Sequence, residues 1–590
     1  MIAHKLLGKF MALGAIGLAV LPIQPAMAQT QTAAEYFRAR LAKNNLPQIL
    51  NADDRTYYSA LFTAIDRENW AGFQQLLNQR ESGPLHAVAL AEYYTHANSP
   101  RVSAEQVSAW FARGIMLPQA EQLGRLGMKR GLTYIPDLPR EQNFARQPGT
   151  SKRVRPSSVN DGSMPQGVSS AILERIVNDD PGGARQLLDG IDAVLSPAAR
   201  AEWRQRVAWS YYIENNDPAA LALAITARSG SGGWVAEADW VAGLAAWRMG
   251  DCDTAASSFA RSAQGSTNAE LTAAAHYWAN RAYMRCRNPG AGVGHLRSAA
   301  RMDETLYGMM ALEQLGQDVP AQHAEADFSD TDWRQLRDEE NVRIALALNE
   351  IGRSRLADEV LRHQARIGDP REFSALSRLA REMGMPATQL WMAYNAPRGT
   401  RAEPALRYPT ANWQPTTGWQ VDPALAFAHA LQESNFRTNA VSPANARGLM
   451  QITPITVRQH APQLNMNASY VNLNDPRVNL AFGQQNLEML RDSGATQGLL
   501  PKIIAAYNAG LSPVTRWNSE VRDQGDPLLY MESIPYWETR SYVAIVMRNY
   551  WMYERQANAL STTRRALAQG MWPTFPEVSG ARAVRLTRNR

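Results

Sequence analysis

The scarcity of β-strand patterns constrains the fold more than any other feature of the sequence. After Gln29, alternating runs of β-branched residues are rare, whereas Ala, Leu, Arg, Gln and Glu recur at helical spacing almost throughout. Of the 590 residues, 45% are apolar and 20% are charged, which excludes bulk disorder and a coiled-coil rod. The sequence therefore predicts an all-α protein built from several structural units.

The charge balance limits the classes of partner. Lys and Arg number 61 and Asp and Glu number 55, giving a net charge of +6 over the whole chain. This balance argues against a nucleic-acid partner. Beyond the first segment, no stretch is apolar enough to cross a bilayer, so we expect no stable membrane insertion.

The first 28 residues have the pattern of a secretory signal peptide. Lys5 and Lys9 precede an apolar run at 10–21, and Ala-Met-Ala at 26–28 supplies a small-x-small cleavage site. The run is shorter than the roughly 20 apolar residues that span hydrocarbon, which disfavours a membrane anchor. We therefore expect export with cleavage and a periplasmic location.

A loose repeat occupies the middle of the chain. Trp209, Trp247 and Tyr283 stand 38 and 36 residues apart, and turn residues follow each of them. Such a period is typical of helix-turn-helix units that stack as an α-solenoid. Cys252 and Cys286, the two cysteines of the sequence, fall at the ends of adjacent units. An oxidising compartment favours a disulfide between them, and the alternative is two buried thiols at helix ends.

Two shifts in composition mark boundaries. Residues 147–166 are rich in Ser, Pro, Gly and Arg and predict a mobile connection within the helical region. Four prolines between 396 and 417 prevent a continuous helix and mark the main domain boundary. The predicted organisation is a signal peptide at 1–28, a helical superhelix at 29–330, a helical linker region at 331–405, a C-terminal domain at 406–560 and a C-terminal extension at 561–590.

A candidate catalytic acid follows this boundary. Asp422 and Pro423 suit the N-cap and first position of a helix, which would carry Glu433 near its end. The carboxylate then shares a helix face with mostly small apolar neighbours, namely Ala426, His429 and Ala430. Partial burial on such a face raises the pKa of a carboxyl group, as a proton donor near neutral pH requires.

Four sequence blocks give this acid a context. They are Glu-Ser at 433–434, Gly-Leu-Met-Gln at 448–451, Ala-Tyr-Asn-Ala-Gly at 506–510 and Ile-Pro-Tyr-Trp-Glu-Thr-Arg-Ser-Tyr-Val at 534–543. In this order and at these separations, the chain closely resembles the soluble lytic murein transglycosylases from about residue 419 to 553. Upstream, Tyr307-Gly308 also resembles the helical region of that family.

The resemblance implies a lysozyme-like catalytic α domain, here 406–560, joined to an α-superhelical solenoid that forms a ring in the family. It implies peptidoglycan glycan strands as partner and cleavage of the β-1,4 bond between N-acetylmuramic acid and N-acetylglucosamine, with a 1,6-anhydromuramyl end as product. By position, Glu433 would protonate the leaving oxygen and then accept the proton of the C6 hydroxyl. Intramolecular attack needs no second catalytic carboxylate, and no acidic residue lies between Glu433 and Asp475.

The resemblance also assigns substrate-binding residues. Ser442 would help to hold the N-acetyl group, and its alternative is a turn residue before Pro443. Gln451 and Tyr507 would line the groove and bond sugar or Glu433, whereas Met450 would belong to the wall or the core.

Two further site residues have comparable structural readings. Asn508 also suits a helix C-terminus with Gly510 as its left-handed cap. Glu538 matches the second glutamate of the family, and its alternative is a first-turn acid that interacts with the helix dipole. The sequence departs from the family at Leu511-Ser512, which precede Pro513, and at Thr453, where many members carry Met.

Competing functions make different demands. A lysozyme-type hydrolase would use the same acid but would need a group to direct water, for which Asp475 and Glu538 are candidates. A non-enzymatic solenoid scaffold would bind peptidoglycan or proteins on a concave surface. Cell-wall assembly proteins are candidate partners in either case. No phosphate loop, zinc cluster or calcium loop is evident, so we expect no cofactor and no metal.

Overall fold

A computed structural model describes residues 32–42, 46–324 and 327–578. Within these ranges almost all regular structure is helical, from α1 to α28, so the predicted all-α class is confirmed. The predicted signal peptide at 1–28 lies outside the described residues. None of the described helices is both long and apolar enough to span a bilayer.

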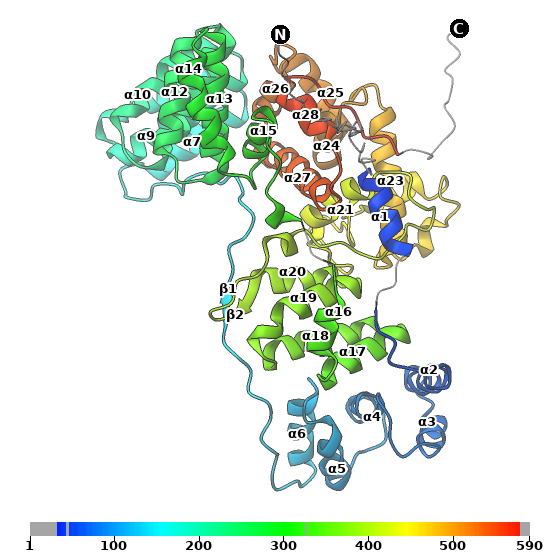
Figure 1. Cartoon of the computed structure of the whole chain (residues 1–590). Coiled ribbons are helices and arrows are strands. Elements are labelled where there is room, and N and C mark those ends of the chain that lie inside the picture. Colours follow the sequence, from blue (N-terminus) through cyan, green and yellow to red (C-terminus); the bar gives the residue numbers. More distant parts are fainter. Residues whose placement is uncertain (1–31, 43–45, 325–326, 579–590) are drawn as a thin grey trace, which may run out of the picture.

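The N-terminal helices and a later helical segment share one hydrophobic core. This core joins residues 50–123 to residues 328–396, and the paired helices lie together at the lower end of the molecule (Figure 1). The first group comprises α2 (Ala52–Asp66), α3 (Trp70–Leu77), α4 (His86–Thr95), α5 (Ala104–Gly114) and α6 (Ala120–Lys129). The second comprises α16 (Asp330–Leu336), α17 (Glu340–Glu350), α18 (Ser354–Ile367), α19 (Phe373–Glu382) and α20 (Pro386–Tyr394).

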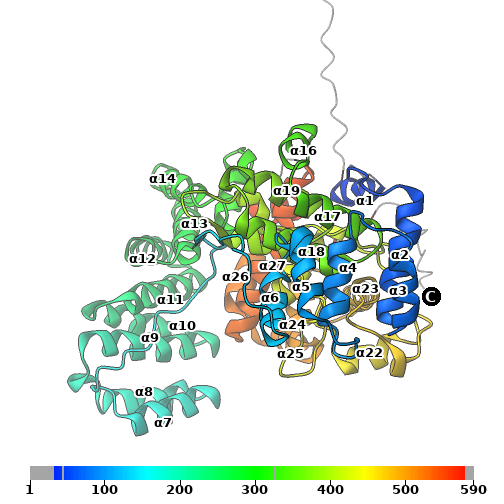
Figure 2. The ribbon, with the colours of Figure 1, turned by 90° about the horizontal axis from the view of Figure 1, so that it is seen from below.

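A second set of helices stacks in chain order into an arm that projects to one side in both ribbon views (Figures 1 and 2). Asn216, Asp251 and Asn288 each begin a helix by accepting a hydrogen bond from a backbone N–H three residues on, which explains the repeated breaks. The predicted superhelix is confirmed. Its helices are α7 (Gln166–Val177), α8 (Pro181–Asp189), α9 (Pro197–Ile213), α10 (Asp217–Thr226), α11 (Gly233–Met249), α12 (Cys252–Gly265), α13 (Ala269–Arg285), α14 (Pro289–Ala300) and α15 (Leu306–Gln314).

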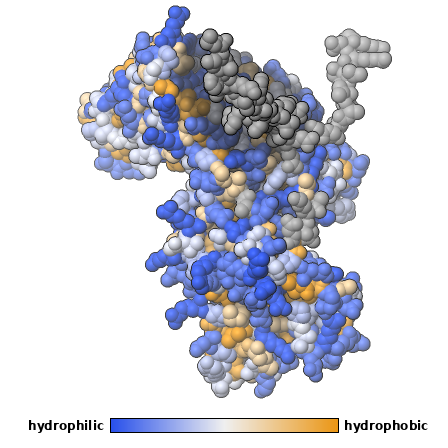
Figure 3. All heavy atoms as spheres, viewed as in Figure 1, coloured by the Kyte–Doolittle hydropathy of each residue, from blue (hydrophilic) through white to orange (hydrophobic). Residues whose placement is uncertain are grey.

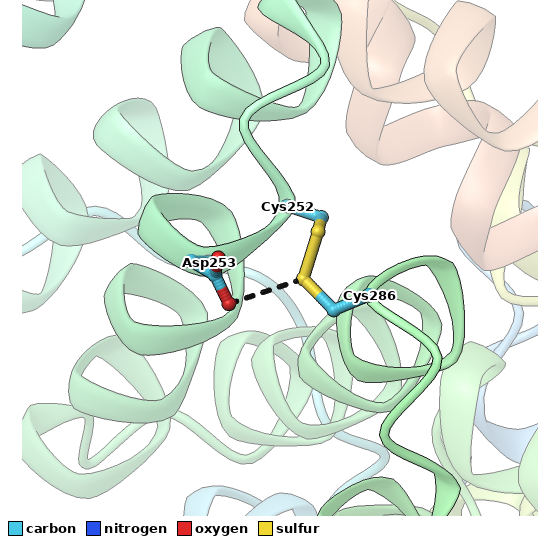
Figure 4. Close-up of side chains that lie close together, drawn as sticks. All are labelled: Cys252, Asp253 and Cys286. Atoms are coloured by element: carbon cyan, nitrogen blue, oxygen red, sulfur yellow. Dashed lines mark hydrogen bonds between the residues drawn. A yellow bond between two sulfur atoms is a disulfide. The ribbon is translucent and has the colours of Figure 1, made fainter.

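A disulfide joins two neighbouring turns of this arm. Cys252, the first residue of α12, is bonded to Cys286, which follows α13, with 5.6 Å between their Cα atoms (Figure 4). The carboxylate of Asp253 lies beside this bond, 3.3 Å from the Cys286 sulfur. The disulfide that the sequence analysis favours is therefore present, and the alternative of two free buried thiols is wrong.

The connection at 147–166 is extended but firmly held, so the prediction of a mobile segment is wrong. The Arg153 side chain is buried and forms ion pairs with Glu237 of α11 and with Glu532 of α26 (Pro527–Ser533), at 3.2 and 3.4 Å. Its guanidinium also lies 4.7 Å from the centre of the Trp240 ring. Just before this segment, β1 (Phe144–Arg146) pairs antiparallel with β2 (Asn395–Pro397), with Ala145 opposite Ala396.

The C-terminal helices surround α27, whose side chains are buried along most of its length. A continuous hydrophobic core links them to the arm, and α15 packs on both α27 and α28. At the other end of the chain, α1 (Ala33–Ala42) packs on α21. The C-terminal helices are α21 (Pro423–Ser434), α22 (Pro454–His460), α23 (Pro476–Asp492), α24 (Leu500–Ala509), α25 (Leu511–Glu520), α26 (Pro527–Ser533), α27 (Trp537–Gln556) and α28 (Thr562–Ala568).

Candidate active site

Helix α21 presents the candidate acid in its last turn. The Asp422 carboxylate caps the helix by accepting a hydrogen bond from the Ala424 N–H at 2.9 Å, and Pro423 occupies the first position, as the sequence predicts. The helix ends where Asn435 adopts a left-handed conformation with φ of 51°. Glu433 therefore lies at the rim of a buried helix, with part of its side chain still accessible.

One phenol binds the Glu433 carboxyl directly. The Tyr542 hydroxyl of α27 donates a hydrogen bond to Glu433 Oε1 at 2.6 Å. Burial is the main cause that raises the pKa of Glu433 to about 7; the Tyr542 hydrogen bond lowers this pKa, and the negative charge of Glu538 raises it. Burial outweighs the hydrogen bond, so the protonated form of Glu433 is populated near neutral pH.

Aromatic rings enclose this carboxyl on the side of the core. The His429 ring, one turn before Glu433, lies 4.7 Å from the Tyr507 ring and 6.2 Å from the Tyr542 ring, measured between centres. Complete burial lowers the pKa of His429 to about 4, and its Nδ1–H donates to the Leu425 carbonyl at 2.9 Å. His429 is therefore neutral near pH 7 and adds no positive charge that would lower the pKa of Glu433.

The loop at 441–453 is fixed by a buried amide. Asn479 donates to the carbonyls of Arg447 and Leu473, each at 2.9 Å, and accepts from the Met450 N–H at 2.9 Å. Gly448 has φ of 73°, and a Cβ there would lie 2.3 Å from the Leu473 carbonyl oxygen, so only glycine fits. The Met450 side chain is fully buried and belongs to the core.

Two predicted binding residues contribute to this same loop. The Ser442 hydroxyl accepts a hydrogen bond from the Ala446 N–H at 3.1 Å, and its own hydrogen stays available as a donor. Gln451 adopts a left-handed conformation with φ of 49°, and its amide donates to the Gly448 carbonyl at 2.9 Å. Both side chains thus shape the loop, and both are only partly buried.

Tyr507 ties the loop to the acid. Its hydroxyl donates to the Met450 carbonyl at 2.8 Å. Burial and the negative charge of Glu433 raise the pKa of Tyr507 well above its ordinary value. Tyr507 therefore stays a neutral donor that holds the loop.

The last two predicted residues lie where α24 meets α27. The Thr539 hydroxyl donates to Asn508 Oδ1 at 2.6 Å and joins the two helices. Glu538 is exposed in the first turn of α27, where its charge acts on Glu433 and on the helix dipole. Gly510 has φ of 86° but ψ of 167°, so the expected left-handed cap is wrong, and the residue instead turns the chain directly from α24 into α25.

Sequence reasoning missed the donor to the acid. Tyr542 lies inside the quoted block at 534–543 and stands four residues after Glu538, hence on the same face of α27. That spacing was the available signal.

The departure at Thr453 also has a structural reading, because its side chain caps α22 by accepting from the Thr456 N–H at 3.2 Å.

Part of the chain resembles known proteins in sequence. Residues 411–529 match the family model described as the transglycosylase SLT domain. The soluble lytic murein transglycosylase of Escherichia coli K12 is 33% identical over 134 residues, which are 22% of this chain and 20% of the relative. A putative soluble lytic murein transglycosylase of Haemophilus influenzae is 35% identical over 137 residues, which are 23% of this chain and 22% of the relative. The match thus spans about a fifth of each curated relative.

The likeness in fold extends much further than the likeness in sequence. The crystal structure of the 70 kDa soluble lytic transglycosylase of Escherichia coli superposes with a TM-score of 0.50 and 16% identity, covering 88% of this chain and 99% of that one. At this identity the likeness shows the fold alone. The chain therefore carries a transglycosylase SLT domain, within the overall fold of the soluble lytic transglycosylases.

Proposed function

We propose that this protein is a peptidoglycan lytic transglycosylase that cleaves the β-1,4 bond between N-acetylmuramic acid and N-acetylglucosamine and leaves a 1,6-anhydromuramyl end. The observation that carries the proposal is the largely buried carboxyl group of Glu433 at the end of α21, whose pKa is raised to about 7 and which accepts a hydrogen bond from the neutral Tyr542 phenol. A group with this pKa is populated as an acid and as a base at the same pH.

The proposed reaction uses both forms in turn. Protonated Glu433 gives its proton to the glycosidic oxygen as that bond breaks. The resulting carboxylate then takes the proton of the muramyl C6 hydroxyl as this oxygen bonds to C1. The attacking group belongs to the substrate, so it is held close without a bound water. The Tyr542 hydrogen bond stabilises the carboxylate between the two proton transfers.

The remaining site residues would bind sugar. Ser442 and Gln451 line the loop beside the acid, and each keeps polar atoms free for an N-acetyl or hydroxyl group. Asn508 and Glu538 would bond sugar at the junction of α24 and α27. Tyr507 would form the wall of the groove and hold the loop through Met450.

Contacts of the acidic residues favour this chemistry over hydrolysis. Asp475, a candidate for directing water, caps α23 through the Arg477 N–H and forms an ion pair with the Arg477 side chain at 3.0 Å. Glu538, the other candidate, is exposed. Neither is arranged as a buried general base near Glu433.

Product analysis tests the proposal. Purified peptidoglycan sacculi are digested with wild type, Glu433→Gln and the control Glu520→Gln, which changes an exposed acid at the end of α25. From wild type and from the control we expect fragments that are one water lighter than the products of hydrolysis. From Glu433→Gln we expect no fragments. Fragments with the mass of hydrolysis products would favour a muramidase. A Glu433→Gln protein that still fulfils the cellular role would favour a scaffold.

We also propose that the mature protein begins near residue 29 and works in the periplasm, in the company of cell-wall assembly proteins. Support comes from the disulfide between Cys252 and Cys286, because disulfides form and persist mainly in oxidising compartments. N-terminal sequencing of the protein from a periplasmic fraction tests the cleavage site. Full-length protein in the cytoplasm would contradict the proposal.

A further inference from the structure

Two adjoining cavities open on the N-terminal helices. The larger, of about 580 Å³, lies among α3, α4 and α5. The smaller, of about 340 Å³, lies between the end of α4, the loop at 96–102 and α6. Tyr94 lines both, so the two cavities adjoin at its ring, and we call the pair the groove. These helices stand at the opposite end of the molecule from α24 to α28 (Figure 1). The groove is therefore separate from the site around Glu433.

The smaller cavity is strongly cationic. Arg101, Arg125, Lys129 and Arg130 all line it, and none of its described lining residues is acidic. The ion pair of Arg125 with Glu121 neutralises one of these charges. The other three cations form no ion pair among the described residues, and the Arg130 Nε is buried without a hydrogen-bond partner. Three positive charges without an ion-pair partner around one cavity favour an anionic ligand at this place.

The larger cavity adds an apolar floor. Trp110 and Leu90 line it, while its two arginines are already engaged: Arg80 binds Asp54 at 2.6 Å, and Arg113 donates to the Glu81 carbonyl at 2.9 Å. Apolar residues also gather on the surface at this lower end of the molecule, between polar ones (Figure 3). The groove thus joins a cationic mouth to a cleft that is partly apolar and aromatic and that Glu81 also lines.

We propose that this groove is a second, non-catalytic binding site for the carboxylate-bearing stem peptides of peptidoglycan. The inference rests on the proposed function, because that function supplies the polymer. Stem peptides combine free carboxylates with short apolar side chains, so the carboxylates would pair with Arg101, Lys129 and Arg130 while methyl groups enter the cleft beside Trp110. A strand held here raises the local concentration of neighbouring glycan at Glu433.

Peptide binding is measured with the full chain carrying Glu433→Gln, which removes turnover. The probe is a fluorescent L-Ala-γ-D-Glu-L-Lys-D-Ala peptide, compared with the same peptide after amidation of its carboxylates. We expect the free acid to bind about tenfold more tightly than the amide, and less tightly as salt rises. Lys129→Gln with Arg130→Gln, and separately Arg101→Gln, should each weaken binding about tenfold. Arg297→Gln, an exposed change on α14, is the control.

Several results would overturn the inference. They are equal binding of acid and amide, unchanged affinity in the cavity variants, or a groove that takes up inorganic phosphate but not the peptide. Circular dichroism confirms that each variant is folded, and Arg101→Gln provides an independent change on a different segment.

A second measurement separates this inference from the proposed function. In the chain with an intact Glu433, the double variant should raise KM on sacculi about tenfold, keep kcat, and leave cleavage of peptide-free glycan strands unchanged. An unchanged KM on sacculi would overturn the second site while cleavage itself stands. Absence of cleavage by wild type on both substrates would overturn the proposed function, and the binding assay would still report on the groove.

Discussion

Removing the Tyr542 hydroxyl tests how the acid is tuned. In Tyr542→Phe the Glu433 carboxyl loses the hydrogen bond of 2.6 Å, the one described contact that lowers its pKa. A hydrogen bond to a charged group contributes about 1.5 to 3 kcal/mol, and 1.36 kcal/mol corresponds to one pKa unit. The pKa of Glu433 should therefore rise from about 7 by about one to two units.

The assay is the pH dependence of kcat/KM, whose alkaline limb reports loss of the essential acid in the free enzyme. Wild type should lose activity above about pH 7, and Tyr542→Phe should keep activity to a higher pH. Tyr470→Phe is the matched control, because this tyrosine belongs to the same C-terminal region and is 85% exposed. An alkaline limb that stays in place or moves down in Tyr542→Phe would refute the account of how the carboxyl is tuned.

Three more outcomes are expected. Glu538→Gln should move the same alkaline limb down, opposite to Tyr542→Phe, because it removes a negative charge that raises the pKa of Glu433. Glu433→Gln should gain stability over wild type as pH rises. Below about pH 4.5 the Glu433 carboxyl is neutral in both the folded and the unfolded state. Between there and pH 7 the folded state resists ionisation, which lowers the free energy of unfolding of wild type by about 3 kcal/mol at most, and above pH 7 this loss levels off. Melting curves from pH 4 to 8 check this, and a constant difference would contradict it. Replacing Cys252 and Cys286 by Ala should lower the free energy of unfolding by about 3 to 4 kcal/mol, by the chain-entropy model for a loop of 34 residues. This loss is measured as a lower melting temperature of the arm, and wild type with its disulfide reduced is the control.

Local rules predicted the helix that carries the acid. Asp422 and Pro423 act through backbone groups one or two residues away, so the sequence alone contains the information. Glu433 could be placed for the same reason, since its position in the last turn follows from the start of the helix. The raised pKa also follows from neighbours on one helix face, although its size depends on rings of Tyr507 and Tyr542 that arrive from other helices.

Contacts between distant segments could not be predicted in this way. Residues 147–166 read as a mobile connection because their composition is that of a loop, yet Arg153 finds Glu237 and Glu532, which are 84 and 379 residues further along the chain. Likewise, Asn479 holds the loop at 441–453 through hydrogen bonds to Arg447, Met450 and Leu473, and no local sequence pattern predicts them. The resemblance supplied most of the site residues, and Tyr542 was overlooked although it lay within a quoted block.

The packing of α1 also sets the order in which the molecule can be completed during synthesis. The Phe37 ring lies 5.6 Å from that of Phe427 and 6.3 Å from that of Tyr553, residues made some 390 and 516 positions later. At about 5 to 20 residues per second, a ribosome needs on the order of 20 to 80 s to reach the first of these partners. Until then these packing partners cannot cover the apolar face of α1. Every nascent chain therefore carries this apolar segment without its packing partners until the C-terminal helices have been made.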